Sequence, residues 1–138
     1  MSDLKVYREA IPEHYDLIAN GIISHNRVHT GEAHGKQLTV LARQQHEVIG
    51  GLWGEVFWSW LKVELLWVRE VERGRGLGRQ ILREAESEAR KDGAVNAFLD
   101  TFSFQALNFY EKEGYEIFGE LPDFPLGHTR YFLRKHLV

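Results

Sequence analysis

The sequence predicts a mixed α/β fold in which antiparallel hairpins come first and strand–helix units follow. Three observations support this: apolar runs of strand length, stretches with apolar residues at helical spacing, and glycine-containing turns between them. The predicted element order is β-α-β-β-β-α-β-α-β-β, which differs from that of a doubly wound sheet. The chain has 138 residues, 43% hydrophobic and 27% charged. This length and composition favour a single domain over residues 1–138 with its own core.

Composition narrows the class of protein. No apolar run approaches the roughly 18 residues of a membrane span, and the first residues lack the basic-then-apolar layout of a secretory signal. The absence of cysteine excludes disulfides, zinc–thiolate sites and a cysteine nucleophile. A net charge of −3 argues against nucleic acid as the main partner. We therefore expect a cytoplasmic protein that binds neither membrane nor nucleic acid.

The first half of the chain predicts one helix among several strands. Residues 4–8 alternate like a short strand, and Pro12 opens a helical pattern that continues to Ile23. Three further strands are predicted at 37–42, 48–58 and 61–68. The last of these has apolar side chains on both faces, as expected of a central strand covered on both sides.

The second half predicts two helices, each followed by strand. Apolar residues from Gly78 to Ala89 fall on one helical face, and Asp92-Gly93 ends that helix. A buried strand at 95–102 leads to Ser103, which has the right chemistry to cap the next helix. That helix carries Tyr110 and stops at Gly114. Two final strands are predicted at 115–121 and 129–133.

A turn rich in glycine and arginine joins the strand at 61–68 to the following helix. It contains Arg73, Gly74, Arg75, Gly76, Gly78 and Arg79. A strand that passes through glycines into a helix N-terminus directs several backbone N–H groups at one point, which suits a phosphate or pyrophosphate. A merely solvated turn is the weaker interpretation, because glycine carries an entropic cost. The third glycine of the dinucleotide fingerprint and the Gly-Lys-Ser/Thr of the P-loop are both missing.

The pattern Arg73-x-x-Gly76-x-Gly78 resembles the R/Q-x-x-G-x-G/A acetyl-CoA-binding motif of the GNAT N-acetyltransferase superfamily. The segment 109–115, Phe-Tyr-Glu-Lys-Glu-Gly-Tyr, is similar to the second signature of that family. The likeness covers nearly the whole chain in element order. It implies a mainly antiparallel sheet flanked by helices and splayed between its central strands.

The resemblance implies acetyl-CoA as co-substrate. The main chain of Val68 would pair with pantetheine, and the turn would hold the pyrophosphate. An asparagine usual in the family is replaced by Ser103, and Asn108 is the candidate substitute. The full set of expected cofactor-binding residues is Leu66, Val68, Arg73, Gly74, Arg75, Gly76, Leu77, Gly78, Arg79 and Asn108.

Direct attack of an amine on the thioester needs an acid for the leaving thiolate and a base for the amine. The motif position implies that Tyr110 is the acid. Glu64 is our candidate base, since a charge amid apolar residues near the splay needs a reason. The alternative is that Glu64 has no catalytic role and only faces a partner charge or bulk water at the rim of the cleft. Asp100 has the same ambiguity, and His128 is better explained as a loop residue.

The expected function is acetyl transfer from acetyl-CoA to a primary amine in a ternary complex. The acceptor is a small molecule or a peptide amine, and relatives built as dimers allow a homodimer. A non-catalytic acyl-CoA-binding sensor is the alternative, which retention of Tyr110 disfavours. We expect no metal, although His25, His29 and His34 are regularly spaced, because no acidic or cysteine partner sits at ligand spacing.

Overall fold

The structure is a computed structural model that describes residues 1–32 and 34–138. The chain divides into two units, Met1–Ala33 and His34–Val138, and each is described by itself. In chain order the elements are α1 (Pro12–Thr30), β1 (Lys36–Gln44), β2 (Glu47–Phe57), β3 (Trp60–Val68), the 3-10 helix η1 (Glu70–Glu72), α2 (Leu77–Lys91), β4 (Asn96–Phe102), α3 (Leu107–Lys112), β5 (Glu116–Pro122) and β6 (Thr129–His136).

The first unit contains α1. Pro12 occupies the first turn, where its missing N–H is not needed, and the helix continues through Thr30. Gly31, with φ of 70°, ends it by donating its N–H to the Arg27 carbonyl at 3.0 Å. The strand expected at 4–8 is wrong, because those residues have no regular secondary structure. Alternation supplies a face for a strand but not the neighbouring backbone that would hold one.

The second unit is built on one six-stranded sheet, ordered β1-β2-β3-β4-β6-β5. Every neighbouring pair is antiparallel except β3 and β4, which are parallel. The two hairpins that open the sheet turn through residues of positive φ: Gln45 and His46 in the first, Trp58 and Ser59 in the second. Such turns match the twist of the strands they join.

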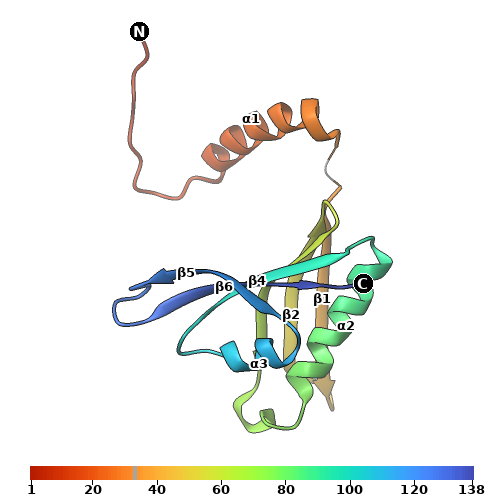
Figure 1. Cartoon of the computed structure of the whole chain (residues 1–138). Helices are drawn as coiled ribbons and strands as arrows, with labels where there is room; N and C mark the ends of the chain where they lie inside the picture. Colours follow the sequence, from red (N-terminus) through yellow and green to blue (C-terminus); the bar gives the residue numbers. More distant parts are fainter. Residues whose placement is uncertain (33) are drawn as a thin grey trace. The chain divides into compact units, whose positions relative to one another are not determined.

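The core of this unit lies where α2 packs across β1, β2 and β3 (Figure 1). The helix presents Ile81, Leu82, Ala85 and Ala89 to the sheet, and none of them is more than 3% exposed. Alanines at two of these positions let the helix approach the strands closely. Around them lie apolar side chains of the central strands, among them Leu52, Val56, Leu61, Val63, Leu99 and Leu133.

The two central strands pair over only part of their length. Within residues 34–138, β3 pairs with β4 only over Trp60–Lys62 and Asn96–Phe98. Beyond that point β3 runs on to Val68 and β4 to Phe102 without meeting. The facing edges therefore carry backbone groups with no strand partner. The expected mainly antiparallel sheet, splayed between its central strands, is confirmed.

The start of α3 differs from expectation. The helix begins at Leu107, its N-cap position is Ala106, and no side chain caps it. Ser103 instead accepts the Thr129 N–H on its hydroxyl oxygen at 3.1 Å. The serine thus joins the end of β4 to the start of β6, so its assignment as the cap of α3 is wrong.

Candidate active site

A cleft of about 990 Å³ opens where β3 and β4 diverge. One wall is the end of β3, from Glu64 to Val68, and the other is Asp100 and Thr101 of β4. The glycine turn and the first turns of α2 close one end, and residues of α3 and the segment before it line the remainder. Figure 1 shows α3 near the N-terminal end of α2. The sequence motifs described above therefore meet at one place.

The glycine turn supplies unpaired hydrogen-bond donors. Within residues 34–138, the backbone N–H groups of residues 74–79 find no protein acceptor. Gly74 and Gly76 have φ values of 79° and 82°, which tilt successive N–H groups toward the same side. The N-terminal end of the α2 dipole adds partial positive charge. This arrangement suits an anion with several oxygens, such as a pyrophosphate.

Ion pairs and one side-chain bond hold the turn to the sheet. Arg69 donates its backbone N–H to the Ile49 carbonyl at 2.8 Å, and its guanidinium pairs with Glu47 at 2.8 Å and Glu72 at 3.1 Å. Arg73 donates from Nε to the Val68 carbonyl at 2.9 Å. The turn is therefore fixed at the end of β3 before any ligand arrives, which lowers the entropic cost of binding.

Gly78 lets α2 approach α3 and β3 closely at the end of the cleft formed by the glycine turn. A Cβ added there would lie 3.5 Å from the Phe109 ring and 3.6 Å from Cγ2 of Val68. A larger side chain would fill space between α2, α3 and β3. Glycine at this position keeps the backbone open to the cleft.

Tyr110 lines the cleft from α3 and is only 7% exposed. Its ring packs against Phe109 and Tyr115, but within residues 34–138 its hydroxyl makes no hydrogen bond. Burial, and secondarily the charge of Asp100, raises the pKa of Tyr110 to about 12. The hydroxyl is therefore a protonated donor at neutral pH, directed by packing rather than by a protein acceptor.

Glu64 enters the cleft because β3 is irregular there. Val63 pairs with Gly54 and Leu65 with Trp53, so Glu64 is the extra residue of a β-bulge. Bulges re-aim a side chain and often lie beside active sites. The carboxylate is 40% exposed and lies 3.3 Å from Lys62 Nζ.

Asp100 is the second carboxylate of the cleft, and Arg130 holds it in place. Its Oδ1 accepts a hydrogen bond from Arg130 Nε at 2.9 Å and forms an ion pair with Arg130 Nη2 at 2.8 Å. The guanidinium lies 5.0–5.4 Å from the ring centres of Phe102, Phe124 and Phe132. Such cation–π contacts restrict the arginine, and through it the carboxylate.

Most of the residues expected from the sequence line the cleft, namely Glu64, Leu66, Val68, Arg73, Gly74, Gly76, Leu77, Gly78, Arg79 and Tyr110. Two do not. Arg75 points to Glu72 at 3.8 Å, and Asn108 lies exposed on α3 outside the lining. His128 is also outside, 3.4 Å from the Ser103 hydroxyl. Sequence reasoning missed Arg83, Lys112 and Glu113, although the spacing of Arg79 and Arg83 was a usable signal.

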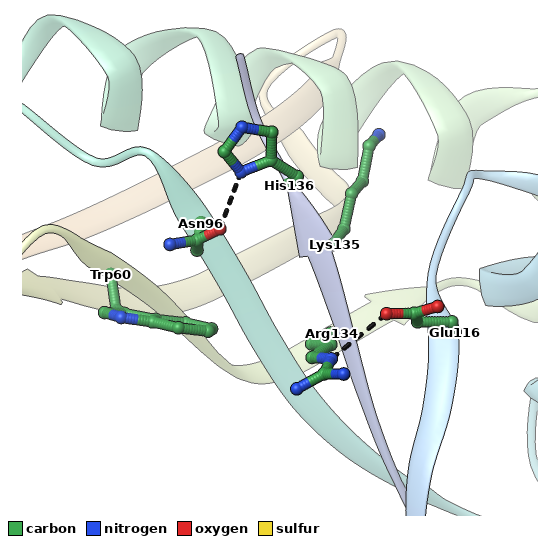
Figure 2. A pocket seen from close by; sticks show the side chains of 6 residues that line it. All are labelled: Trp60, Asn96, Glu116, Arg134, Lys135 and His136. Atoms are coloured by element: carbon green, nitrogen blue, oxygen red, sulfur yellow. Dashed lines mark hydrogen bonds and ion pairs between the residues drawn. The ribbon is translucent and has the colours of Figure 1, made fainter.

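A smaller pocket of about 230 Å³ lies elsewhere on the second unit (Figure 2). It is lined by Trp60, Asn96, Glu116, Arg134, Lys135 and His136. Its polar groups already bond to each other: His136 with Asn96 at 2.9 Å, and Arg134 with Glu116 at 3.1 Å. Among residues 1–32 and 34–138, no group of three or more His, Asp or Glu side chains could hold a metal ion. Over the same residues, no helix is both long and apolar enough for a bilayer.

Comparison with known proteins decides the family. Residues 35–117 match the model of the acetyltransferase (GNAT) domain. The chain belongs to the GNAT acetyltransferase family. It is an acetyl-CoA-dependent N-acetyltransferase.

Proteins similar to this GNAT chain include acetyltransferases from several bacteria. It is 41% identical over 100 residues to a blasticidin-S acetyltransferase from Streptomyces morookaense, covering 72% of this chain and 74% of that protein. A crystal structure of an Agrobacterium tumefaciens acetyltransferase superposes with a TM-score of 0.91 at 32% identity, covering 98% and 99% of the two chains. A Bacillus anthracis streptothricin acetyltransferase solved with acetyl-CoA shares the fold, with a TM-score of 0.66, 21% identity and coverage of 72% and 62%.

The glycine turn of this GNAT enzyme gives a direct prediction. Gly76→Ala is expected to raise the KM for acetyl-CoA about tenfold, because a Cβ at a φ of 82° is strained and shifts the N–H groups. Initial rates at varied acetyl-CoA would measure it. Gly93→Ala is the matched control: its φ is 93°, its Cβ also meets nothing within 4 Å, and it lies outside the cleft.

Both glycine variants should lose about 1 kcal/mol of unfolding free energy from backbone strain. Only Gly76→Ala should lose cofactor affinity. Equal KM values in the two variants would mean that the turn does not hold the pyrophosphate.

Proposed function

We propose that this acetyltransferase moves the acetyl group of acetyl-CoA to a primary amine of a small molecule, by direct attack in a ternary complex. The observation that supports the proposal most strongly is the set of chemical groups that line the cleft. Unpaired N–H groups at residues 74–79 lie at one end, while Tyr110, Glu64 and Asp100 line the same space. A polyanionic donor and an amine acceptor thus have separate, suitable surroundings.

The donor would lie along the splay between β3 and β4. Its pyrophosphate would accept hydrogen bonds from the glycine turn, and its pantetheine amides would pair with the free edge of β3 as an added strand would. Leu66 and Val68 lie on that edge and line the cleft. This placement would bring the thioester toward Tyr110, which lines the same cleft.

The reaction requires one bond to form and one to break. The amine nitrogen attacks the thioester carbonyl carbon, and the C–N bond forms while the C–S bond breaks. The ammonium first gives one proton to Glu64, directly or through water, and Glu64 releases it to solvent. After the attack the nitrogen loses a second proton to Glu64, which again passes it to solvent, while Tyr110 supplies a proton to the leaving sulfur. Tyr110 then regains a proton from solvent.

The base is needed because the acceptor is mostly protonated. An alkyl amine with a pKa near 10.4 is neutral in about one molecule in 2,500 at pH 7, a cost of about 4.6 kcal/mol. Glu64 is the better candidate because its bulge position and partial exposure leave it accessible to an incoming amine. Asp100 is the weaker candidate, because its Oδ1 already accepts a hydrogen bond from Arg130 Nε and is ion-paired with Nη2 of the same side chain.

The acceptor we propose is a small cationic amine. Two carboxylates, Glu64 and Asp100, stand on opposite walls of the cleft and favour a positively charged approach. The name of the blasticidin-S acetyltransferase relative points to the same class of acceptor. Blasticidin S is therefore the first compound to try.

The test is thiol release from acetyl-CoA in the presence of a panel of amines: blasticidin S, polyamines, aminoglycosides, amino acids and peptide N-termini. We expect the highest kcat/KM with a small cationic amine, with the product identified as an N-acetyl derivative by mass spectrometry. Preference for peptide amines would overturn the acceptor assignment.

We also propose that residues 1–138 act as one acetyltransferase domain. A similar solved structure supports this, because the match covers 98% of this chain and 99% of that one. The enzyme works in the cytoplasm without membrane or nucleic-acid partners, in keeping with its net charge of −3. A homodimer is the assembly we propose, and light scattering on the full chain would test it.

A further inference from the structure

A cluster of charged residues occupies the rim of the cleft beyond the glycine turn. Arg79 and Arg83 are four residues apart, about one turn, on α2. Lys112 and Glu113 lie at the C-terminal end of α3. All four line the cleft. The transfer step described above uses none of Arg83, Lys112 and Glu113.

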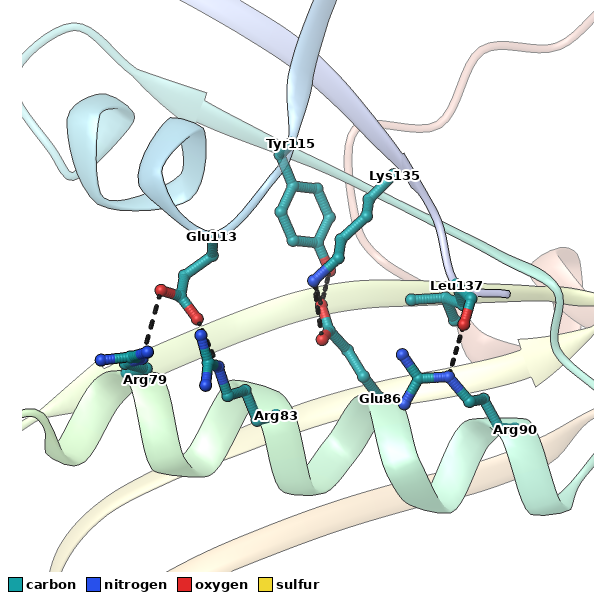
Figure 3. A network of polar contacts seen from close by, with 8 residues as sticks. All are labelled: Arg79, Arg83, Glu86, Arg90, Glu113, Tyr115, Lys135 and Leu137. Atoms are coloured by element: carbon teal, nitrogen blue, oxygen red, sulfur yellow. Dashed lines mark hydrogen bonds and ion pairs between the residues drawn. The ribbon is translucent and has the colours of Figure 1, made fainter.

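Glu113 fixes the two arginines in place. Its side chain is 8% exposed, with Oε1 3.0 Å from Arg83 Nε and Oε2 3.6 Å from Arg79 Nε (Figure 3). Each oxygen therefore faces one guanidinium. Within residues 34–138, the terminal nitrogens of these two guanidinium groups have no other partner. Their remaining N–H donors are available to a ligand.

The charges do not cancel. Arg79, Arg83 and Lys112 bring three positive charges against the single carboxylate of Glu113. Arginines on a preorganised surface are suited to bidentate recognition of phosphate. A phosphate monoester carries a charge near −2 at neutral pH, so it would interact more strongly than a diester.

The position of the cluster relative to the turn selects the ligand. Four residues of helix rise about 6 Å, so Arg83 lies about one helical turn from the N–H groups of residues 74–79. A ligand with a pyrophosphate and a second phosphate group attached close to it could reach both the turn and the arginines.

Coenzyme A has this arrangement, with a 3′-phosphate on the ribose next to its pyrophosphate. We propose that Arg83, with Arg79 and Lys112, forms a subsite for the 3′-phosphate of coenzyme A, and that Glu113 positions the two arginines. The inference rests on the proposed function, because it assumes that the turn holds the pyrophosphate. It makes the enzyme selective for coenzyme A over 3′-dephospho-coenzyme A.

The test compares binding of coenzyme A and 3′-dephospho-coenzyme A to the full chain by titration calorimetry, without an acceptor. Wild type should bind coenzyme A about tenfold more tightly. In Arg83→Gln the ratio of the two Kd values should fall toward 1. Arg43→Gln, an exposed arginine of β1 outside the cleft, should keep the wild-type ratio.

The selectivity should also fall as salt is raised from 0.05 to about 0.5 M, because the contacts are exposed ion pairs. If wild type binds both compounds equally, the subsite is absent and the arginines only join α2 to α3. If neither compound binds, the proposed cofactor site itself is wrong. Thermal melts of Arg83→Gln and Arg43→Gln show whether either variant is folded, and the wild-type comparison stands without them.

Discussion

Replacing Tyr110 by phenylalanine is expected to lower kcat about 100-fold, while the KM for acetyl-CoA changes little. The ring remains and fills the same space between Phe109 and Tyr115, so only the hydroxyl is lost. A positioned general acid contributes about 10²- to 10⁴-fold. We expect the lower end, because a pKa raised to about 12 makes the phenol a weaker acid than free tyrosine.

The raised pKa also sets the pH profile. The causes are burial first and the charge of Asp100 second, and both favour the neutral phenol. The donor form therefore persists until the pH approaches 12. We expect kcat to rise with pH as the amine loses its proton and to show no decline below about pH 10, because the phenol is still protonated there. A decline centred near pH 8 would assign the acid to another group.

Tyr115→Phe is the matched control for this experiment. Tyr115 packs against Tyr110, but its hydroxyl donates to Glu86 at 2.7 Å and it lies outside the cleft lining. Its loss should reduce stability by about 1–2 kcal/mol and leave kcat within about twofold. Steady-state kinetics and urea unfolding on both variants separate the two roles. Unchanged turnover in Tyr110→Phe would exclude it as the acid.

The parts predicted well from sequence are those in which local pattern and tertiary structure agree. The strand at 61–68, the glycines after it and the apolar face of α2 belong to one contiguous stretch of chain, so spacing alone constrains them. The splay of β3 from β4 could not be predicted from local spacing, because periodicity does not show where two strands stop pairing. The prediction of the splay rested on the resemblance to the GNAT family.

The parts that sequence reasoning missed depend on contacts between distant segments. Ser103 has a side chain suited to capping a helix, but in the structure its hydroxyl oxygen accepts the Thr129 N–H of β6 instead. Glu113 could not be assigned to Arg79 and Arg83, because nothing local places the end of α3 beside α2. The bulge at Glu64 likewise depends on the register of β2 against β3. A sequence gives each residue's chemistry but not which distant partner reaches it.

Replacing Lys135 by methionine is expected to give the largest loss of stability, about 3 kcal/mol. Glu86 on α2 is 2% exposed, and its oxygens accept hydrogen bonds from Lys135 Nζ at 2.9 and 3.1 Å and from the Tyr115 hydroxyl (Figure 3). Removing one partner of a buried pair leaves an uncompensated charge, which costs about 3–5 kcal/mol. Lys135 is 20% exposed, so we expect the lower end.

A loss of this size corresponds to a fall in Tm of about 10 °C for a chain of this length. Lys91→Met is the control, because the same substitution there removes an exposed ion pair with Glu88 at 2.7 Å and should cost under about 1 kcal/mol.

The double variant Glu86→Leu/Lys135→Met separates the charge from the packing. It replaces the buried pair with apolar groups of similar size, so most of the lost stability should return. Calorimetry and urea unfolding would give the three free energies needed for the comparison. If Lys135→Met and Lys91→Met cost the same, Glu86 is solvated in the folded chain. The network then does not fasten α2 to β6, and the position of α2 depends on its packing against β1, β2 and β3.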